Sequence, residues 1–320
     1  MEYAYTSLLA AHITGLIAEK RAGGCLYRDA AYMLKVFDTF MEDSFPNEHT
    51  ITRDAACSWS KKKDSEGHNN LLNRVSQVRQ LALFMCRTGT PAFVPDAKGL
   101  ASRVKPEHYI FAPEGLTAFF DAADAYDFGA LAPWRSLVAP AVLKTVYCLG
   151  LRPCEALRLS VGDVDLKAGS VDIYQSKGDK DRTVYLAEDL CESLVEYDKA
   201  IESMLPGRKA FFPNGKGTMY ATDTLRGWFT DIWRTLFPEG ASCPDIPSLM
   251  SLRHTFATER IRLWAAEGRD LRSCIYYLVE HMGHKSIHET EYYLHLAPFH
   301  FSEMLAKVEP LSSPLIPEVV

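Results

Sequence analysis

The sequence lacks paired cysteines and long hydrophobic runs. Its 320 residues include eight cysteines, but none form a Cys-x-x-Cys pair and most stand within apolar runs. This distribution argues against a disulfide framework and is typical of reduced thiols in the cytoplasm. No stretch is long and apolar enough to span a membrane. The N-terminal segment has no basic leader and carries His12 and Glu19 in its apolar part, so it predicts an amphipathic helix rather than a signal peptide.

An excess of positive charge is also missing. The net charge is -6 and the pI is about 5.9, which at face value disfavours a nucleic-acid partner. However, residues 1–108 hold 14 Lys and Arg against 12 Asp and Glu, and the remainder holds 21 against 29. Phosphate binding depends on a local basic surface, so the total charge excludes little. The run Lys61-Lys62-Lys63 is either a solvated loop or a contact for DNA.

The sequence contains no internal repeat, and its hydrophobic pattern is mainly helical. Apolar residues recur at helical spacing over 1–90, 114–126, 133–149 and again up to about 310, with one β-rich stretch between them. We expect a mainly α protein with a small β-sheet. The segment 88–116 holds four prolines and few periodic apolar residues, and within it we expect a linker over 96–112. The expected domains are therefore 1–95, which is helical, and 113–311, which is mixed α and β, followed by a flexible tail, 312–320.

The β-rich stretch reads SVDIYQSKGDKDRTVYLA. Alternating apolar residues (Val171 and Ile173, then Val184 and Leu186) flank a polar segment that suits a hairpin turn at Gly178-Asp179. A lysine at such a tip is either solvated or delivered into a groove as a proton donor or phosphate contact. The pattern alone does not decide between these two interpretations.

A candidate anion site lies just before this hairpin, in LGLRPCEALRLS. Proline favours the first helical turn, so Pro153 places Arg152 at the N-cap and Glu155 at the third helical position. Arg152 would then stand where free N–H groups and the helix dipole favour an anion. Glu155 could hold its guanidinium or cap the helix. The alternative is a surface arginine beside a capping glutamate.

A second arginine occurs in PSLMSLRHTFATERIRLW. Leu252, Phe256 and Leu263 share one face of the predicted helix, which directs its other face outward. Arg253 adjoins this seam and is suited to bidentate contact with a phosphate. His254 could be a ligand, a catalytic group or a histidine at the edge of the core, and spacing alone favours the last.

The segment MGHKSIHETEYYLH concentrates three histidines and two tyrosines. Gly283 predicts the end of one helix and Ser286-x-x-Glu289 a capping box for the next, with His284 in the turn between them. His284 and His288 would not share a helix, and no cysteine or HExxH pattern completes a zinc site. Tyr292 and Tyr293 would lie in the second helix, where tyrosines usually belong to a core or an interface.

Taken in order, these motifs resemble the tyrosine recombinase (phage integrase) family, in particular Xer-like and mobile-element integrases. The resemblance rests on five residues: Arg152 in GLRPCEAL, Lys177 in KGDKDR, Arg253 in LRHTFAT, His284 in MGHKSI and Tyr293 in YLH. It implies a helical, SAM-like core-binding domain followed by a catalytic domain. It also implies a site-specific recombinase that exchanges DNA strands without metal or other cofactor.

The resemblance implies a role for each residue. Tyr293 attacks a scissile DNA phosphate and forms a 3′-phosphotyrosyl intermediate, while Arg152 and Arg253 neutralise the developing charge. Lys177 protonates the leaving 5′-oxygen. The remaining roles are a hydrogen bond from His284 to the phosphate and orientation of Arg152 by Glu155. Tyr293 is preferred over Tyr292 because Tyr293-Leu294-His295 fits the family's Tyr-x-His ending.

One position departs from the family pattern. Met250 stands three residues before the second arginine, where histidine or lysine is usual. Methionine carries no proton and makes only weak hydrogen bonds. Either His254 or a water molecule compensates for the missing histidine or lysine, or DNA cleavage is slower than in a site that has this residue.

The resemblance further implies assembly on DNA. An amphipathic helix expected over 299–311 would pack on its own domain or dock on a neighbour in a homotetramer bound to a double-stranded recombination site, with a monomer in the free state. Accessory proteins could take part, and no membrane partner is expected. The alternatives are an impaired, DNA-binding accessory protein that needs an active partner, a zinc-dependent protein, and a type IB topoisomerase-like enzyme that relaxes DNA without a specific site.

Overall fold

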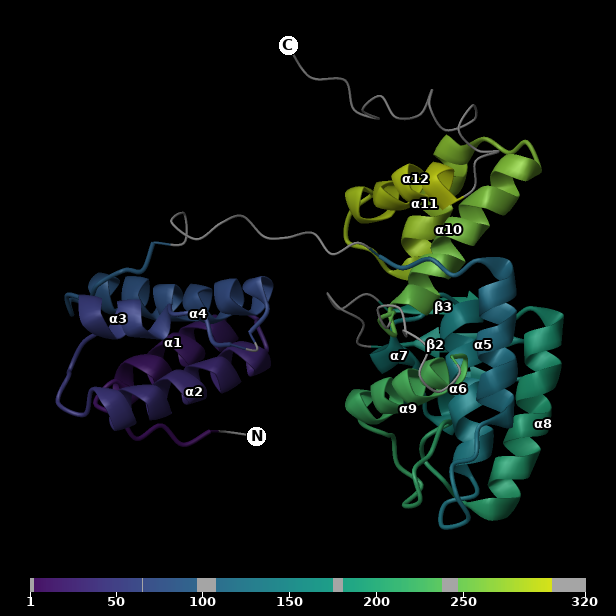
Figure 1. Cartoon of the computed structure of the whole chain (residues 1–320), viewed down its shortest axis with the longest axis horizontal. Coiled ribbons are helices and arrows are strands. Elements are labelled where there is room, and N and C mark those ends of the chain that lie inside the picture. Colours follow the sequence, from purple (N-terminus) through teal and green to yellow (C-terminus); the bar gives the residue numbers. More distant parts are fainter. Residues whose placement is uncertain (1–2, 65, 97–107, 175–180, 238–246, 301–320) are drawn as a thin grey trace. The chain divides into compact units, whose positions relative to one another are not determined.

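The computed structural model describes residues 3–64, 66–96, 108–174, 181–237 and 247–300, and for 295–300 the backbone alone. The chain divides into two compact units, Met1–Pro106 (unit 1) and Glu107–Val320 (unit 2). Figure 1 shows both units and labels their elements. Among the described residues, none of the helices combines the length and the apolar composition that crossing a bilayer requires.

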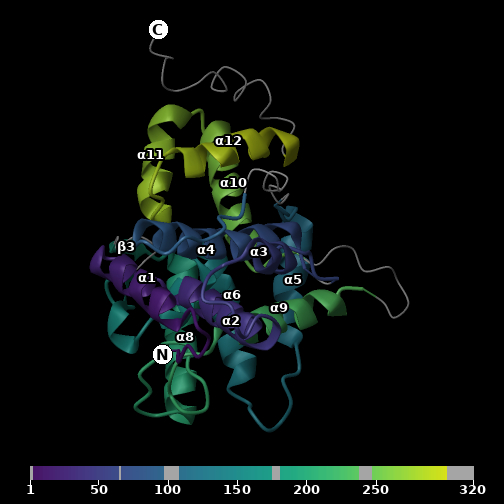
Figure 2. The same cartoon turned by 90° about the vertical axis from the view of Figure 1, so that its left-hand side faces the viewer.

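Unit 1 is a group of four helices: α1 (Ala10–Ala22), α2 (Arg28–Ser44), α3 (Arg53–Trp59) and α4 (His68–Arg87). The helices pack against one another around an apolar core (Figure 2). The core side chains of α2 recur at helical spacing, at Ala31, Leu34, Phe37 and Met41. The predicted N-terminal amphipathic helix corresponds to α1, which buries Ile13, Leu16 and Ile17.

A buried carboxylate connects the segment before α1 to α2. The carboxylate of Asp38, which is fully buried, accepts hydrogen bonds from the backbone N–H groups of Thr6 and Ser7 and from Lys35 Nζ. These bonds lower the pKa of Asp38 although burial opposes them. They attach the segment before α1 to α2, because a buried carboxylate needs such partners.

Unit 2 contains the sheet and all the other helices in the described part of the chain. Its elements are α5 (Pro113–Ala125), α6 (Arg135–Cys148), α7 (Pro153–Arg158), a 3-10 turn (Val161–Asp163), β1 (Val164–Asp165), β2 (Ser170–Ile173), β3 (Arg182–Tyr185), α8 (Glu188–Met204), α9 (Thr222–Thr235), α10 (Ser251–Ala266), α11 (Leu271–Met282) and α12 (His288–His300). The three strands form an antiparallel sheet in the order β1-β2-β3, with Val171 opposite Val184. The expected class, mainly α with a small sheet, is confirmed.

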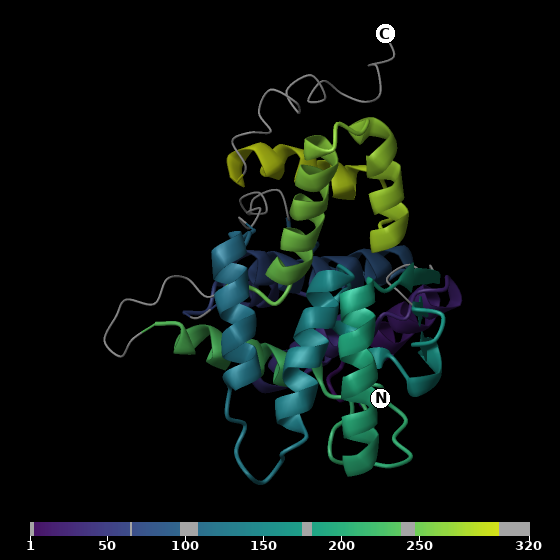
Figure 3. The same ribbon diagram turned by 90° about the vertical axis from the view of Figure 1, so that its right-hand side faces the viewer.

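Two apolar clusters make up unit 2, and α10 belongs to both. The larger cluster joins α5, α6, α8, α9 and the sheet, and it includes Leu252 at the start of α10. The smaller one contains Phe256 and Ile261 of α10 with side chains of α11 and α12. In Figure 3, α10 extends from the body of the unit toward these two helices. Residues at the start of α10 therefore lie where the two clusters meet.

Most elements agree with the sequence, and the exceptions have physical causes. The helices predicted over 114–126 and 133–149 are α5 and α6. The predicted outward face of the helix containing Arg253 is wrong, because every residue from Ser251 to Thr258 is buried. Leu263, expected in the core, is half-buried. The hairpin tip with Lys177 and the tail 312–320 lie outside the described residues, as does 301–311, while 299–300 continue α12.

Candidate active site

The first part of the site is the start of α7. Gly150 ends the turn after α6 at a φ of +58°, and Arg152 is the N-cap residue of α7, with Pro153 in the first helical turn. Glu155 Oε2 accepts a hydrogen bond from the Arg152 backbone N–H at 3.0 Å, and Oε1 accepts one from Arg152 Nη1 at 2.7 Å. Glu155 therefore both caps the helix and holds the guanidinium, so the two predicted alternatives occur together.

Arg182 of β3 joins this pair and was missed from the sequence. Its Nη2 donates to Glu155 Oε2 at 2.8 Å, and its Nε donates to the His281 carbonyl at 2.7 Å. The side chain is 9% exposed. The only signal in the sequence for a role of Arg182 in the site is its position at the start of the second predicted strand, close to Lys177.

Arg253 is the most deeply buried member of the site, at 1% exposure. Its Nη1 donates to the Gly150 carbonyl at 2.6 Å and its Nη2 to the Met282 carbonyl at 2.7 Å. Burial, followed by the charge of Arg152, lowers its pKa to about 10, so the guanidinium remains charged at neutral pH. The Glu155 carboxylate lies 4.0 Å away.

The end of α11 gathers the three arginines. The carbonyls of His281, Met282 and Gly283 accept, in that order, from Arg182, Arg253 and Arg152. The last carbonyls of a helix lack intrahelical partners and carry the negative end of its dipole. Three guanidinium groups thus face one carboxylate and one helix terminus. This leaves a net positive charge that favours an anion at the site.

His284 follows this helix end. Gly283 adopts the left-handed conformation at φ +62°, as predicted for a helix stop, and it turns the chain so that His284 is buried at 5% exposure. The His284 Nδ1 lies 2.6 Å from Thr290 Oγ1 of α12. Burial, followed by the positive charges of Arg253 and Arg152, lowers the pKa of His284 to about 3. The imidazole is therefore neutral and can act as a hydrogen-bond donor through one ring nitrogen.

Tyr293 of α12 lies against these groups. It is 3% exposed, and its ring stacks on that of His284 with centroids 6.3 Å apart. Burial raises the pKa of Tyr293 to about 12, although the charges of Arg253 and Arg152 oppose the increase. Tyr292 is half-buried and packs edge-on against the His108 ring. Tyr293 is thus the tyrosine that lies among the buried arginine and histidine side chains.

His254 contacts Tyr293 directly. Its Nδ1 is 2.8 Å from the Tyr293 hydroxyl, and it is 8% exposed. His254 is thus a buried histidine, as expected for one at the edge of the core, and it also contacts the Tyr293 hydroxyl. The sequence could not reveal this contact, because the two residues are 39 positions apart and on different helices. Met250, the N-cap of α10, is half-buried one turn before His254, whose N–H donates to its carbonyl.

In the described part of the chain, His, Cys, Asp and Glu side chains form no group of three that could hold a metal ion. Four of the five residues of the recombinase-like set, namely Arg152, Arg253, His284 and Tyr293, gather in unit 2 together with Glu155, Arg182 and His254. Lys177 lies outside the described residues. A buried hydroxyl beside several cations has the composition needed for nucleophilic attack on a phosphate ester.

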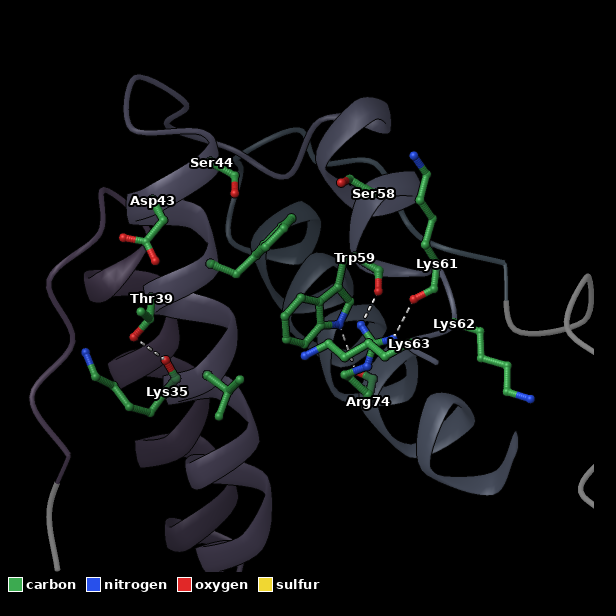
Figure 4. A pocket seen from close by; sticks show the side chains of 12 residues that line it. Lys35, Thr39, Asp43, Ser44, Ser58, Trp59, Lys61, Lys62, Lys63 and Arg74 are labelled. Atoms are coloured by element: carbon green, nitrogen blue, oxygen red, sulfur yellow. Dashed lines mark hydrogen bonds between the residues drawn. The ribbon is translucent and has the colours of Figure 1, made fainter. Parts of the chain in front are cut away.

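Unit 1 contains a separate cavity of about 570 Å³ (Figure 4). Its lining includes Trp59, Lys61, Lys62 and Lys63, together with Arg74, which donates to the carbonyls of Trp59 and Lys61. Glu66 pairs with Arg74 at 2.8 Å. These bonds give Arg74 a structural role. The three lysines provide a basic surface of the kind that phosphate binding needs.

Comparisons with known proteins show which family the chain resembles. The pattern of the Phage integrase family matches residues 119–300. The chain is 25% identical over 308 residues to y4rB of Sinorhizobium fredii, a protein provisionally named integrase/recombinase, and the match covers 92% of this chain and 94% of y4rB. It is 28% identical over 174 residues to the tyrosine recombinase XerD of Staphylococcus epidermidis, covering 53% of this chain and 54% of XerD.

A solved structure supports the same fold. The lambda integrase tetramer bound to a Holliday junction matches with a TM-score of 0.60 and 14% sequence identity, covering 87% of this chain and 77% of lambda integrase. At this identity the likeness concerns the fold alone. The site residues of this chain therefore rest on its own geometry and on the order of its motifs.

Proposed function

The chain belongs to the phage integrase family, and we propose that it is a site-specific tyrosine recombinase that cuts and rejoins DNA through a 3′-phosphotyrosine at Tyr293. The observation that carries this proposal is the position of Tyr293: its buried hydroxyl lies 2.8 Å from His254 Nδ1, and its ring stacks on His284, which directly follows the end of α11 where the three arginines donate to backbone carbonyls. A hydroxyl in this position, next to positively charged guanidinium groups that can neutralise a phosphodiester, is suited to in-line attack on phosphorus.

The remaining roles follow from the contacts of each side chain. Arg152 and Arg253 are oriented by Glu155, by backbone carbonyls and by the helix end, so they can neutralise the nonbridging oxygens without reorganising. Neutral His284 donates a hydrogen bond to the phosphate. Lys177 protonates the leaving 5′-oxygen, as the family resemblance implies. The bond energy is kept in the phosphotyrosine ester, so the reaction needs neither metal nor another cofactor.

The proposed partner is a double-stranded DNA recombination site. The protein would bind this site as a homotetramer and be a monomer when free, and its gene would originate from a mobile element. The related lambda integrase is a tetramer in its solved complex. Unit 1 would serve as the core-binding domain, and its Lys61–Lys63 run is the candidate for phosphate contacts. A cytoplasmic location remains a prediction from the cysteine pattern.

Covalent trapping tests this function. Wild-type protein and Tyr293→Phe are incubated, with EDTA present, with labelled nicked duplexes made from the DNA that flanks the gene, and adducts are resolved on a denaturing gel. We expect an adduct with the wild type and none with Tyr293→Phe, while Tyr292→Phe, the matched control, still forms it. If all three proteins bind the same DNA and none forms an adduct, the catalytic proposal fails and the accessory-protein alternative takes its place.

A further inference from the structure

The contact between His254 and Tyr293 joins two buried groups with complementary hydrogen-bonding states. His254 stands on α10 and Tyr293 on α12, with 2.8 Å between Nδ1 and the hydroxyl and 5.6 Å between the ring centroids. The His108 ring also packs on the imidazole of His254, with centroids 3.9 Å apart. Contacts with these two rings fix the orientation of the imidazole relative to the phenol.

The direction of this hydrogen bond follows from the charge state of each group. Burial, followed by the charges of His108, Arg253 and His284, lowers the pKa of His254 to about 3, so at neutral pH the ring has one nitrogen with a free lone pair. The pKa of Tyr293 is raised to about 12, so its hydroxyl keeps its proton. The neutral pair therefore suits donation from the Tyr293 O–H to His254 Nδ1.

No other described contact gives this hydroxyl an equally close proton acceptor. Met250, one turn earlier on the same face of α10, ends in a thioether that cannot take up a proton at neutral pH. The arginines that face the phenol are donors. His284 lies against the Tyr293 ring, and its Nδ1 is paired with Thr290.

We propose that His254 is a catalytic residue that accepts the phenolic proton as Tyr293 attacks DNA, an inference that rests on the proposed function. In this step the bond between Tyr293 Oη and phosphorus forms and the bond between phosphorus and the 5′-oxygen breaks. The phenolic proton moves to His254 Nδ1, and the leaving oxygen takes its proton from a separate acid. On religation, His254 returns the proton to the departing phenolate oxygen.

Binding of DNA prepares His254 for this role. In the free protein, burial and the positive charge of Arg253 disfavour a proton on His254. A phosphodiester brings a negative charge to the arginines and offsets part of this repulsion, so the basicity of His254 increases when substrate is bound. Proton transfer is thereby coupled to occupancy of the phosphate site.

The test compares single-turnover adduct formation between pH 6 and 9 for the full-length wild type, His254→Ala and His254→Asn. Asparagine places an amide where Nδ1 lies, so it can hold the hydroxyl but cannot accept its proton. His288→Asn is the matched control, because His288 is an exposed histidine on α12. A duplex with sulfur in place of the bridging 5′-oxygen has a leaving group that needs no proton. DNA binding and thermal unfolding are measured for each protein.

We expect both His254 variants to form adduct about 100-fold more slowly at pH 7, with DNA binding within twofold of the wild type. Their rates should rise with pH more steeply than that of the wild type, and the sulfur substrate should not restore them. The inference is overturned if folded His254→Asn reacts within about threefold of the wild type, or if the sulfur substrate restores it. If the wild type itself forms no adduct, the proposed function is overturned as well. If the wild type is active and the His254 variants are slow, the proposed function and the role of His254 are both upheld.

Discussion

At the scale of single residues, Glu155 organises the positive charge of the site. Its carboxylate is 2% exposed and binds Arg152 and Arg182, with Arg253 at 4.0 Å. A buried charge that loses its partner is strongly destabilising, because neither water nor another group replaces the interaction. The stability of unit 2 and the geometry of the arginines therefore depend on the same side chain.

Replacing Glu155 tests this dependence. Glu155→Gln keeps the shape of the side chain but removes the charge shared by three guanidinium groups. We expect the free energy of unfolding to fall by about 3 kcal/mol, measured by urea denaturation, and adduct formation to slow. Glu267→Gln is the matched control, because its pair with Arg269 is about half exposed and should contribute less than about 1 kcal/mol. Equal stability losses in the two variants would contradict this account.

Some site residues could be predicted from sequence and others could not. Pro153 determines the start of α7 and so the relation of Arg152 to Glu155, which is a local effect of helix capping. Arg182 and His254 join the site through contacts across 27 and 39 positions. Hydrophobic spacing carries no information about such pairs. The sequence offered His254 as one candidate to compensate for Met250, whereas its contact with the Tyr293 hydroxyl is visible only in the three-dimensional arrangement.

At the scale of elements, the turn between α6 and α7 is constrained by α10. A Cβ on Gly150 would lie 2.3 Å from the Phe256 ring, and its φ of +58° is one that other residues rarely adopt. The same residue offers its carbonyl to Arg253. The glycine in the GLRP motif thus positions two arginines through one turn.

Gly150→Ala should therefore destabilise unit 2 by about 2 kcal/mol or more, since backbone strain and steric overlap add, and it should displace Arg253. The matched control is Gly227→Ala in the middle of α9, where no atom lies within 4 Å of the added Cβ. That change should stabilise the helix by about 0.5–1 kcal/mol. Thermal unfolding of both variants gives the comparison, and an unchanged midpoint in Gly150→Ala would refute the packing argument.

Helices α10 to α12 also make stability dependent on pH. The pKa values of His254, His281 and His284 are all lowered, mainly by burial, so below about pH 6.5 the unfolded chain binds more protons than the folded one. Their stabilising contribution is complete above that pH and is lost as the pH falls toward about 3, the folded-state value for His254 and His284.

We expect the free energy of unfolding to decrease between pH 6.5 and 4.5 by at most about 1.4 kcal/mol per pH unit for each histidine. Urea denaturation at several pH values measures this slope. His254→Asn should reduce it by the share of one histidine, while His288→Asn, at an exposed position, should leave it unchanged. A slope that is the same in all three proteins would be inconsistent with burial of neutral His254.

Element boundaries were largely predictable because they depend on local signals. Pro153 identified the start of α7 and Gly283 the end of α11, while hydrophobic spacing over 114–126 gave the bounds of α5 within one or two residues. The burial of α10 on nearly all sides near its start was not predictable, because it results from two clusters meeting around one helix. Periodicity describes one buried face and fails where a helix is enclosed.

At the scale of the whole molecule, the two units have separate apolar cores. The sequence assigns 96–112 to a linker, yet Phe111 is 2% exposed in the larger core of unit 2 and its N–H donates to Thr255 Oγ1 at 3.0 Å. His108 packs on His254. Composition therefore indicates where the hydrophobic pattern changes along the chain, while packing decides which residues belong to unit 2.

Separate fragments test this division. Residues 1–96 and 108–320 should each unfold cooperatively, because each keeps its own core. A shorter fragment, 113–320, should be less stable than 108–320 by about 3 kcal/mol, since it loses the buried Phe111 ring. Circular dichroism during thermal unfolding measures both effects. Equal stability of fragments 108–320 and 113–320 would show that residues 108–112 contribute nothing to the stability of unit 2.

The most direct test of the central claim identifies the atom that carries the DNA. The trapped adduct is digested with nuclease and protease, and the modified peptide is sequenced by mass spectrometry. The account predicts a nucleotide attached to Tyr293 through its 3′-phosphate, with no modification of Tyr292. A nucleotide on another residue, a linkage through a 5′-phosphate, or no modified peptide from protein that binds the same DNA would contradict it.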